Sequence, residues 1–373
     1  MAEGSNTISS LIPRNQFRPF FESLDTSARE IYATILDGYC RQSAEIYLGD
    51  LPGWEYDGLW NLIHCMKDEI PELYFVRFNS GVVRAFQARH GLTDAKYIPQ
   101  YLFTSDEAKS IEVEMSARAK SVLAGVEGRS SSDKAEMIHD WLITRYRYDK
   151  PDRRYTHEAP GAMLYGISVC EGVAKAFKWL CDRCGVRCYV CVGRTGEKYK
   201  QGLDDGWHAW NIVDFGTPRK KVWRHVDVTW DAGRSRENKM LRYDYFGLSD
   251  RVIRVDHELG VHSFYPHCKT SSDWYASHGL YARDPSSFGA IMQKVFESKR
   301  KRIAVRIPIQ LEEMREKACP VVWESARKVS VGLSGFTTQL DPDTGICQFT
   351  FHYKSSESGG WLMKSTASRS TRR

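Results

Sequence analysis

Apolar residues recur at helical intervals in the first third of the chain. Two amphipathic runs, residues 31–39 and 59–66, predict helices, and Pro71 closes the second of them. Residues 73–78 and 97–103 are instead continuous apolar and aromatic runs, which predict strands. The alternation of these two patterns predicts an α+β segment at the start of the chain.

Capping residues predict two more helices further along. Thr104 and Glu107 have the spacing of a capping box at the head of a helical pattern that extends to about residue 126. The stretch 125–132 is rich in Gly and Ser and lacks periodicity, which indicates a loop between domains. Asp133 is the predicted N-cap of the next helix, which has one apolar face.

The following helical pattern begins at a cysteine. Ser168 and Glu171 have capping-box spacing, which predicts Ser168 as the N-cap and Cys170 as the second helical residue. The apolar face continues to Gly185, a residue type that commonly ends helices. A thiol in the first turn faces unpaired backbone N–H groups and the positive end of the helix dipole, so we expect its pKa to be depressed. The alternative is a small packing residue, as buried cysteines often are.

A β-hairpin is predicted downstream of this cysteine. Residues 206–213 and 221–231 are rich in β-branched and aromatic side chains, and the segment between them carries the Gly and Pro of a turn. A turn centred on residues 217–218 places His208 and Asp227 directly opposite each other on one face of the hairpin. The hairpin would therefore bring an imidazole and a carboxylate together.

These residue types make a nucleophile, a base and an orienting acid. Asp227 would fix the tautomer of His208, whose other nitrogen could then take a proton from Cys170. His225, on the same strand as Asp227, is predicted to be structural. Three tryptophans of the hairpin are candidates for the walls of a substrate channel, although hairpin tryptophans are also common in cores: Trp207, Trp210 and Trp230.

Three short motifs resemble one known family. Val-Cys-Glu-Gly at 169–172, His-Ala-Trp-Asn at 208–211 and Val-Asp-Val-Thr-Trp-Asp at 226–231 are similar to motifs of the bacterial transglutaminase-like superfamily. The likeness extends over about residues 133–250, with a weaker similarity at 68–74. It implies an α+β fold with a papain-like core, in which the catalytic Cys begins a helix packed on an antiparallel sheet that carries the His and the Asp.

The resemblance also implies a chemistry. Cys170, His208 and Asp227 match the family's nucleophile, base and orienting acid, which agrees with the assignment made above from the residues alone. The implied function is that of a cysteine enzyme acting on amide bonds of proteins or peptides through a thioester, as a protease or amidase if water resolves it and an acyltransferase if a primary amine does. The alternative is a catalytically inactive binding module of the same fold.

The predicted organisation has five parts. They are a disordered start at 1–18, an N-terminal α+β segment at 19–128, a transglutaminase-like catalytic domain at 129–271, a C-terminal α/β extension at 272–355 and a disordered basic tail at 356–373. A long polar insert at 196–206, just before His208, is predicted to be either a lid or a tolerated surface loop.

Composition and charge add limits on partners and location. The 373 residues include 53 basic and 47 acidic side chains, and the net charge of +6 makes no general case for nucleic-acid binding. The first thirty residues lack a long apolar core flanked by basic residues. We therefore expect a cytoplasmic protein with no membrane partner, whose ten cysteines are reduced.

Four of the cysteines lie close together, at positions 181, 184, 188 and 191. Their spacing raises the possibility of zinc, but structural zinc sites usually separate two C-x-x-C pairs by a longer loop. Cys188 and Cys191 are also predicted to lie on opposite faces of a strand, so core packing is the preferred interpretation. Asp204 and Asp205 of the polar insert are too few ligands for calcium. We expect neither a metal nor a cofactor.

Overall fold

The computed structural model describes residues 12–13, 16–149, 153–196, 206–260, 265–270, 274–307, 312–341 and 344–354. The chain folds into two compact units, residues 1–274 and 275–373. The predicted boundary at 271/272 lies close to this division, whereas the N-terminal segment and the predicted catalytic domain share the first unit. The expected basic tail, most of the polar insert with Asp204 and Asp205, and residues 1–11, 14 and 15 of the expected disordered start lie outside the described residues. The last part of that start is ordered, contrary to the expectation: Gln16 is buried and donates to the carboxylates of Glu72 and Asp182.

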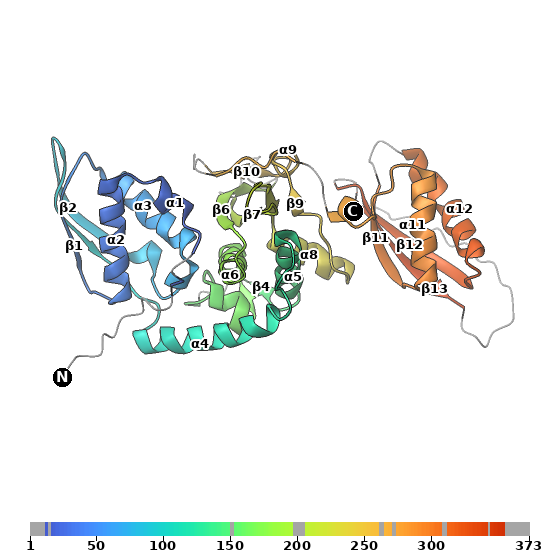
Figure 1. Ribbon diagram of the computed structural model, residues 1–373, viewed down its shortest axis with the longest axis horizontal. Coiled ribbons are helices and arrows are strands. Elements are labelled where there is room, and N and C mark those ends of the chain that lie inside the picture. Colours follow the sequence, from blue (N-terminus) through green and yellow to red (C-terminus); the bar gives the residue numbers. More distant parts are fainter. Residues whose placement is uncertain are drawn as a thin grey trace, which may run out of the picture. The chain divides into compact units, whose positions relative to one another are not determined.

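The N-terminal part of the first unit packs helices against a small antiparallel sheet (Figure 1). The strand order is β1-β3-β2, with bounds β1 Ile46–Pro52, β2 Val82–Ala88 and β3 Gly91–Ile98. The helices are α1 Pro19–Ser23, α2 Thr26–Cys40, α3 Tyr56–Glu69 and α4 Ser105–Val122. The two predicted helical runs lie in α2 and α3, and the predicted capping box at the start of α4 is confirmed.

The predicted strand at residues 73–78 is wrong. This apolar run forms short 3-10 turns at Pro71–Leu73 and Phe78–Ser80, between which only Val76 makes a single β-bridge, to Tyr101. The side chains of Tyr74 and Phe75 are fully buried, and a continuous apolar run does not distinguish a buried turn from a buried strand. Of the predicted strand at 97–103, only Tyr97 and Ile98 lie in a strand, at the end of β3, and neither β1 nor β2 was predicted.

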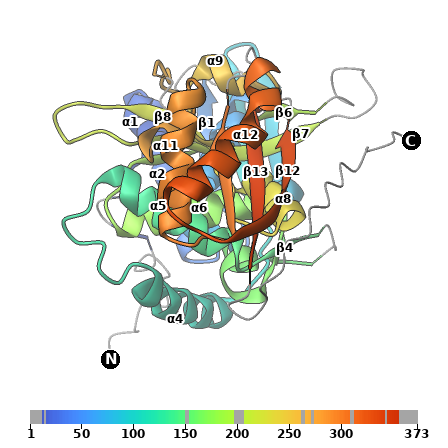
Figure 2. The same cartoon turned by 90° about the vertical axis from the view of Figure 1, so that its right-hand side faces the viewer.

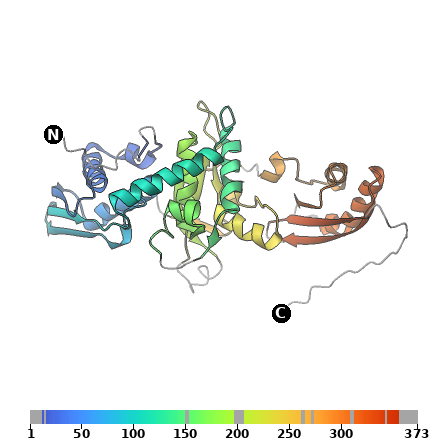
Figure 3. The same cartoon turned by 90° about the horizontal axis from the view of Figure 1, so that it is seen from below.

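The remainder of the first unit is built on a five-stranded antiparallel sheet in the order β10-β6-β7-β8-β9. Its strands are β6 Cys188–Thr195, β7 Trp207–Asp214, β8 Trp223–Val226, β9 Phe246–Leu248 and β10 His257–Leu259. The helices here are α5 Ser131–Ile143, α6 Cys170–Arg183, α8 Val228–Asn238 and α9 Asp250–Ile253, and α4 leads from the N-terminal sheet to α5 (Figure 3). Helix α6 packs on β6 and β7 and contacts α5 and α8.

The short elements around α6 set its position. A two-residue parallel pair joins β4 Arg147–Tyr148 to β5 Ile167–Ser168, and a π-helical turn covers Gly161–Tyr165.

The predicted N-cap Asp133 is wrong: Ser130 caps α5 and accepts from the backbone N–H of Asp133. Ser130 wins because its hydroxyl lies one residue before the first helical turn, where the unpaired N–H groups point.

The second unit is a separate α/β layer. Helices α11 Pro285–Glu297 and α12 Glu312–Lys328 lie over an antiparallel sheet of order β11-β13-β12 (Figure 2). Its strands are β11 Arg302–Arg306, β12 Leu333–Asp341 and β13 Ile346–Tyr353, and the short helix α10 covers Trp274–Ser277. The core between the layers includes Phe288, Phe296, Val305, Phe349 and Phe351. Within the described residues, each helix is either too short or too polar to span a bilayer.

Candidate active site

Cys170 is the first residue of α6. The predicted capping box is wrong: Val169 occupies the N-cap position and makes no side-chain cap hydrogen bond. Ser168 instead belongs to β5, where its buried hydroxyl donates to the carbonyl of Thr156, and the carboxylate of Glu171 binds Lys67. The sulfur is therefore one residue nearer the helix start than predicted, where backbone N–H groups lack helical acceptors.

Gly172 allows a loop to close over the start of α6. A Cβ at this position would lie 2.4 Å from the hydroxyl of Ser168, 2.7 Å from the carbonyl oxygen of Thr156 and 2.9 Å from that of Glu158. No larger residue fits without displacing this backbone. The glycine of the Cys-Glu-Gly motif therefore allows the loop beside Cys170 to approach this closely.

The thiol of Cys170 lies among groups that favour the thiolate. Burial raises its pKa, but the hydrogen bond and the charge of His208 and the backbone N–H of Ala209 outweigh burial and leave the pKa below the ordinary value. Burial and the proximity of the sulfur raise the pKa of Tyr148, whose hydroxyl hydrogen-bonds to Cys170. The expected depression of the thiol pKa thus comes mainly from His208.

His208 and Asp227 meet directly. His208 Nε2 lies 2.7 Å from Asp227 Oδ2, and both side chains are buried. Burial lowers the pKa of His208, but the charge and hydrogen bond of Asp227 and the hydrogen bond to Cys170 raise it to about 10. Asp227 is also the N-cap of α8, and its Oδ1 accepts from the backbone N–H groups of Thr229 and Trp230. One carboxylate therefore caps a helix and orients an imidazole.

The predicted hairpin register is wrong by two residues. Asn211 lies opposite Val226, whereas the predicted register pairs Val226 with Ala209. The two-residue offset keeps every side chain on its original face of the sheet. Since β8 ends at Val226, Asp227 turns into α8 and reaches His208 diagonally rather than from the opposite position.

A second histidine binds the same carboxylate oxygen. His257 of β10 places Nε2 3.1 Å from Asp227 Oδ2, and its Nδ1 lies 2.6 Å from Asp256 Oδ1. The sequence reasoning missed this residue, because β10 has only three residues and shows no periodicity. The sequence feature that could have indicated a strand pairing here is Gly193 of β6. A Cβ at this position would lie 2.1 Å from the carbonyl oxygen of Glu258, so only glycine lets β10 pair closely with this edge of the sheet.

The three candidate channel tryptophans occupy different environments. Trp207 is 58% exposed and lies under the guanidinium of Arg194. Trp210 is buried, stacks on His208 and donates its indole N–H to His225 Nδ1, so it lies in the core of the sheet. Trp230 is partly buried, with its ring 4.5 Å from that of His257. Trp207 and Trp230 stay candidates for substrate contact.

His225, predicted to be structural, lies in a second cluster with Asp250 and Cys268. The Nε2 atom of His225 lies 2.9 Å from Asp250 Oδ1, while Nδ1 accepts from the indole of Trp210. Because the indole can only donate, the proton of a neutral His225 must sit on Nε2, which leaves no free lone pair for a metal there. Burial lowers the pKa of His225, which favours this neutral form.

The four closely spaced cysteines separate in the fold. Cys181 and Cys188 interact directly, whereas Cys191 packs in another cluster with Cys268. Within the described part of the chain, the groups of three or more possible metal ligands contain none of these four residues. The other such group is His208, Asp227 and His257, where the distances of 2.7 and 3.1 Å are those of direct hydrogen bonds.

A buried ion-pair network lies beside Cys170. Glu171 binds Lys67 of α3 and lies 3.2 Å from Lys175, whose Nζ is 2.9 Å from Glu158 Oε2. His157 Nδ1 lies 3.0 Å from the second oxygen of Glu171. Burial raises the pKa of Glu171, but the charges of Lys175 and Lys67 outweigh it and hold the pKa well below the ordinary value. The N-terminal segment thus supplies a cation beside the residue that follows Cys170.

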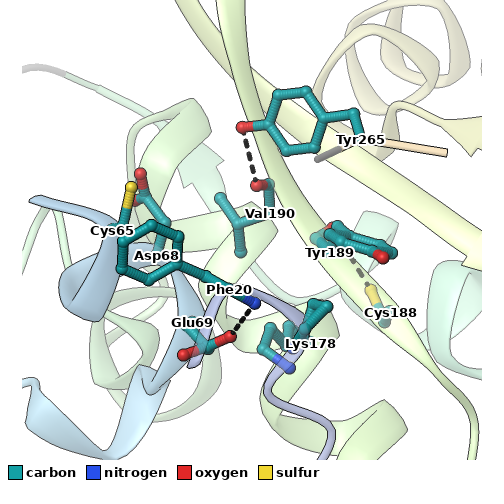
Figure 4. Close-up of a pocket in the computed structure, with 10 residues that line it drawn as sticks. Phe20, Cys65, Asp68, Glu69, Lys178, Cys188, Tyr189, Val190 and Tyr265 are labelled. Carbon is teal, nitrogen blue, oxygen red and sulfur yellow. Dashed lines mark hydrogen bonds between the residues drawn. The ribbon is translucent and has the colours of Figure 1, made fainter. Parts of the chain in front are cut away.

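A small cavity of about 20 Å³ lies between the N-terminal helices and β6 (Figure 4). Its lining includes Phe20, Asp68, Glu69, Lys178 and Tyr265 and none of the three candidate catalytic residues. Glu69 accepts from the backbone N–H of Phe20 at 2.6 Å. The volume corresponds to about one buried water, so the cavity is too small for a peptide.

Comparison with known proteins places this geometry in a family. Residues 116–228, which contain Cys170, His208 and Asp227, match the family model of the transglutaminase-like superfamily. This segment is a transglutaminase-like core. Its helix, antiparallel sheet and order of Cys, His and Asp are those that the sequence motifs imply.

Three solved structures are similar to parts of the chain. They are a TGase (14% identity, TM-score 0.28, 40% of this chain and 43% of that one), a candidate cysteine protease from Cytophaga hutchinsonii (14%, 0.25, 40% and 64%) and a candidate protease from Parabacteroides distasonis (8%, 0.23, 39% and 39%). The chain thus spans less than two thirds of each of these proteins. No curated protein matches it.

Proposed function

We propose that the transglutaminase-like core is a cysteine enzyme that acts on amide bonds of proteins or peptides. The observation that carries this proposal is the position of His208, which hydrogen-bonds to Cys170 and whose Nε2 lies 2.7 Å from Asp227 Oδ2. This is the arrangement of a nucleophile, a base and an orienting acid.

The proposed first half-reaction forms a thioester. The Cys170 thiolate attacks the amide carbonyl carbon, and the developing oxyanion accepts from backbone N–H groups at the start of α6 and from the hydroxyl of Tyr148. The C–N bond then breaks, and the imidazolium of His208 gives its proton to the departing nitrogen. Asp227 stabilises the imidazolium until that proton leaves.

The second half-reaction decides the class of enzyme. His208 removes a proton from water or from a primary amine, which attacks the thioester carbon and releases the Cys170 thiolate. Water completes hydrolysis, whereas an amine completes transamidation. The exposed Trp207 directly precedes His208 in β7, and the ring of the partly buried Trp230 lies 6.1 Å from that of His208. We propose both tryptophans as contacts for substrate or acceptor.

The test combines a glutamine-rich protein, such as casein, with a fluorescent primary amine. Amine incorporation, ammonia release and chain cleavage are measured for the full chain, for Cys170→Ala and for the matched control Cys319→Ala, which removes an exposed cysteine of the second unit. We expect at least one of these products from the wild type and from Cys319→Ala, and none from Cys170→Ala. The proposal fails if no product depends on Cys170, and the protein is then an inactive binding module.

A further inference from the structure

The carboxylate of Asp227 makes more hydrogen bonds than its contact with His208 alone would require. Its Oδ1 accepts two backbone N–H groups, from Thr229 at 2.9 Å and Trp230 at 3.1 Å. Its Oδ2 faces two imidazoles, His208 at 2.7 Å and His257 at 3.1 Å. An ionised carboxylate offers about four lone-pair positions, so all of them are occupied. The base in the triad therefore shares its orienting acid with another histidine.

Both nitrogens of His257 face carboxylates. Nε2 faces Asp227, and Nδ1 lies 2.6 Å from Asp256 Oδ1, whose other oxygen accepts from the hydroxyl of Tyr245 at 2.5 Å. Ionised carboxylates only accept, so two such bonds require a proton on each ring nitrogen. Burial lowers the pKa of His257, but hydrogen bonds with Asp227 and Asp256 outweigh it and raise the pKa. The two contacts therefore favour the imidazolium form of this buried side chain.

Among the described residues, several other titratable or aromatic groups lie near His257. His208 lies 5.6 Å away between ring centroids, and His225 of β8, whose pKa is lowered by burial, also interacts with His257. Tyr245 carries the guanidinium of Arg234 over its ring and lies 5.6 Å from His257. The remaining neighbours are the indole rings of Trp210 and Trp230, at 5.0 and 4.5 Å. The nearest compensation for its charge is therefore Asp227 and Asp256.

We propose that His257 is a positioning residue of the triad, a buried cation that holds Asp227 in place and takes up part of its negative charge. The inference rests on the proposed roles of Cys170, His208 and Asp227. A neutral replacement that keeps the hydrogen bond leaves the full carboxylate charge to His208, which then holds its proton more tightly. The imidazolium of His208 would become a poorer acid toward the departing amine.

The first test observes His257 directly. Histidine side chains of the full chain are labelled with ¹⁵N and followed by NMR at pH 7.5, with the His257 signals assigned by their loss in His257→Gln. We expect both ring nitrogens to be protonated in the wild type. In Asp256→Asn, which removes one carboxylate charge and whose amide can donate to Nδ1 while its oxygen accepts from Tyr245, we expect His257 to be a neutral imidazole with its proton on Nε2. A neutral His257 in the wild type overturns the proposal.

The second test measures the effect on His208. Cys170 is labelled with short pulses of iodoacetate at a series of pH values between 7 and 11, and its alkylation rate is measured at each pH. We expect this rate to fall at the pH where His208 loses its proton, because the thiolate then loses its imidazolium partner. We expect His257→Gln to move this fall upward by about 1 to 2 pH units, as expected for removal of a unit charge at this distance, and Asp256→Asn to move it upward by less. His267→Gln, at an exposed histidine that faces Asp250, should leave it unchanged.

The two roles of His257 predict opposite results. If His257 only supports the fold around Asp227, its replacement loosens the bond to His208 and the fall in rate moves to lower pH, which contradicts the proposal. Asp256→Asn provides the same information if His257→Gln does not fold. Stoichiometric metal in the purified protein, lost from His257→Gln, would also overturn the proposal. Failure of the proposed function is distinguishable, because Cys170 would then show no enhanced alkylation at any pH.

Discussion

His208 and Asp227 are joined by a 2.7 Å hydrogen bond although they are not paired in the sheet. His208 projects from β7, whereas Asp227 is the first residue after β8 and the N-cap of α8. The strand end, the helix cap and the imidazole therefore depend on a single carboxylate. Substitutions at Asp227 affect catalysis and helix stability in ways that can be separated.

Asp227→Asn tests the orienting role without removing the cap. The amide oxygen can still accept from the backbone N–H groups of Thr229 and Trp230, while the charge beside His208 is lost. We expect the rate of amide turnover to fall by about 10²- to 10⁴-fold, with the far-UV circular dichroism unchanged. Asp227→Ala should also lose about 1 kcal/mol of stability in urea, because the cap is removed. Unaltered turnover in Asp227→Asn would contradict the orienting role.

Cys170 should react selectively with iodoacetamide near neutral pH. Its pKa is lowered by His208, whereas burial raises the pKa values of Cys40, Cys65 and Cys184. Mass spectrometry after brief labelling should find Cys170 modified at least about tenfold faster than the exposed Cys319. His208→Gln should remove most of this difference. Equal rates for Cys170 and Cys319 would show that the thiolate is not activated.

Gly172→Ala should disturb the start of α6. The added Cβ would lie 2.4 to 2.9 Å from Ser168, Thr156 and Glu158, so we expect a loss of about 1–3 kcal/mol in urea denaturation and slower alkylation of Cys170. Gly233→Ala is the matched control, since its Cβ would meet no atom within 4 Å inside α8. That change should be neutral or stabilise by about 0.5–1 kcal/mol. Similar losses from both substitutions would argue against the close approach at Gly172.

His139 should make stability depend on pH. It is fully buried with Asp140 and Asp231 each 3.0 Å from a ring nitrogen. Burial lowers its pKa, but the hydrogen bonds and charges of these two carboxylates raise it to about 9. Because the folded pKa exceeds that of the unfolded chain, about 6.5, the contribution is complete below pH 6.5 and is lost as the pH rises toward 9.

The expected size of this contribution is on the order of 3 kcal/mol. The difference in unfolding free energy between the wild type and His139→Gln should therefore shrink from pH 6 to pH 9 in guanidinium titrations. A difference that stays constant over this range would mean that His139 is not charged in the folded state.

The tryptophans should separate into contact and core residues. Trp207→Ala removes an exposed ring, so we expect the unfolding free energy to change by no more than about 0.5 kcal/mol while KM for the protein substrate rises. Trp210→Ala should cost about 3–5 kcal/mol, because it empties a buried site and leaves His225 Nδ1 without its donor. An unchanged KM in Trp207→Ala would remove Trp207 from the substrate surface.

Elements with strong local signals were predictable from the sequence. The helix that begins at Cys170 and ends before Gly185, the capping box of α4 and the strand that carries His208 all follow from periodicity and capping residues. The cap of α6 was not predictable in the same way, because Ser168 and Glu171 found stronger partners in Thr156 and Lys67, which are distant in sequence. Local capping preference does not determine the structure where tertiary contacts already satisfy the same side chains.

Only the candidate residues on elements with a recognisable sequence pattern, Cys170, His208 and Asp227, were predictable. The contact between His208 and Asp227 was predicted correctly although the predicted strand register was wrong by two residues. Side chains two residues apart on a strand lie on the same face of the sheet, so this offset did not separate them. His257 and Tyr148 come from strands of three and two residues, which carry no periodic signal. Their positions depend on strand pairing at the sheet edge and on β4 lying beside β5.

Lys67 bears on whether the core can exist as an independent module. A fragment excised at residue 129 would retain Cys170, His208 and Asp227 but would lose Lys67, which binds Glu171 directly after the nucleophile. Glu171 would then keep only Lys175 as a paired lysine, together with the hydrogen bond to His157, in a buried setting that two lysines now balance. The charge balance around Cys170 therefore includes a residue of the N-terminal segment, and we expect a fragment without α3 to be less stable than the full first unit.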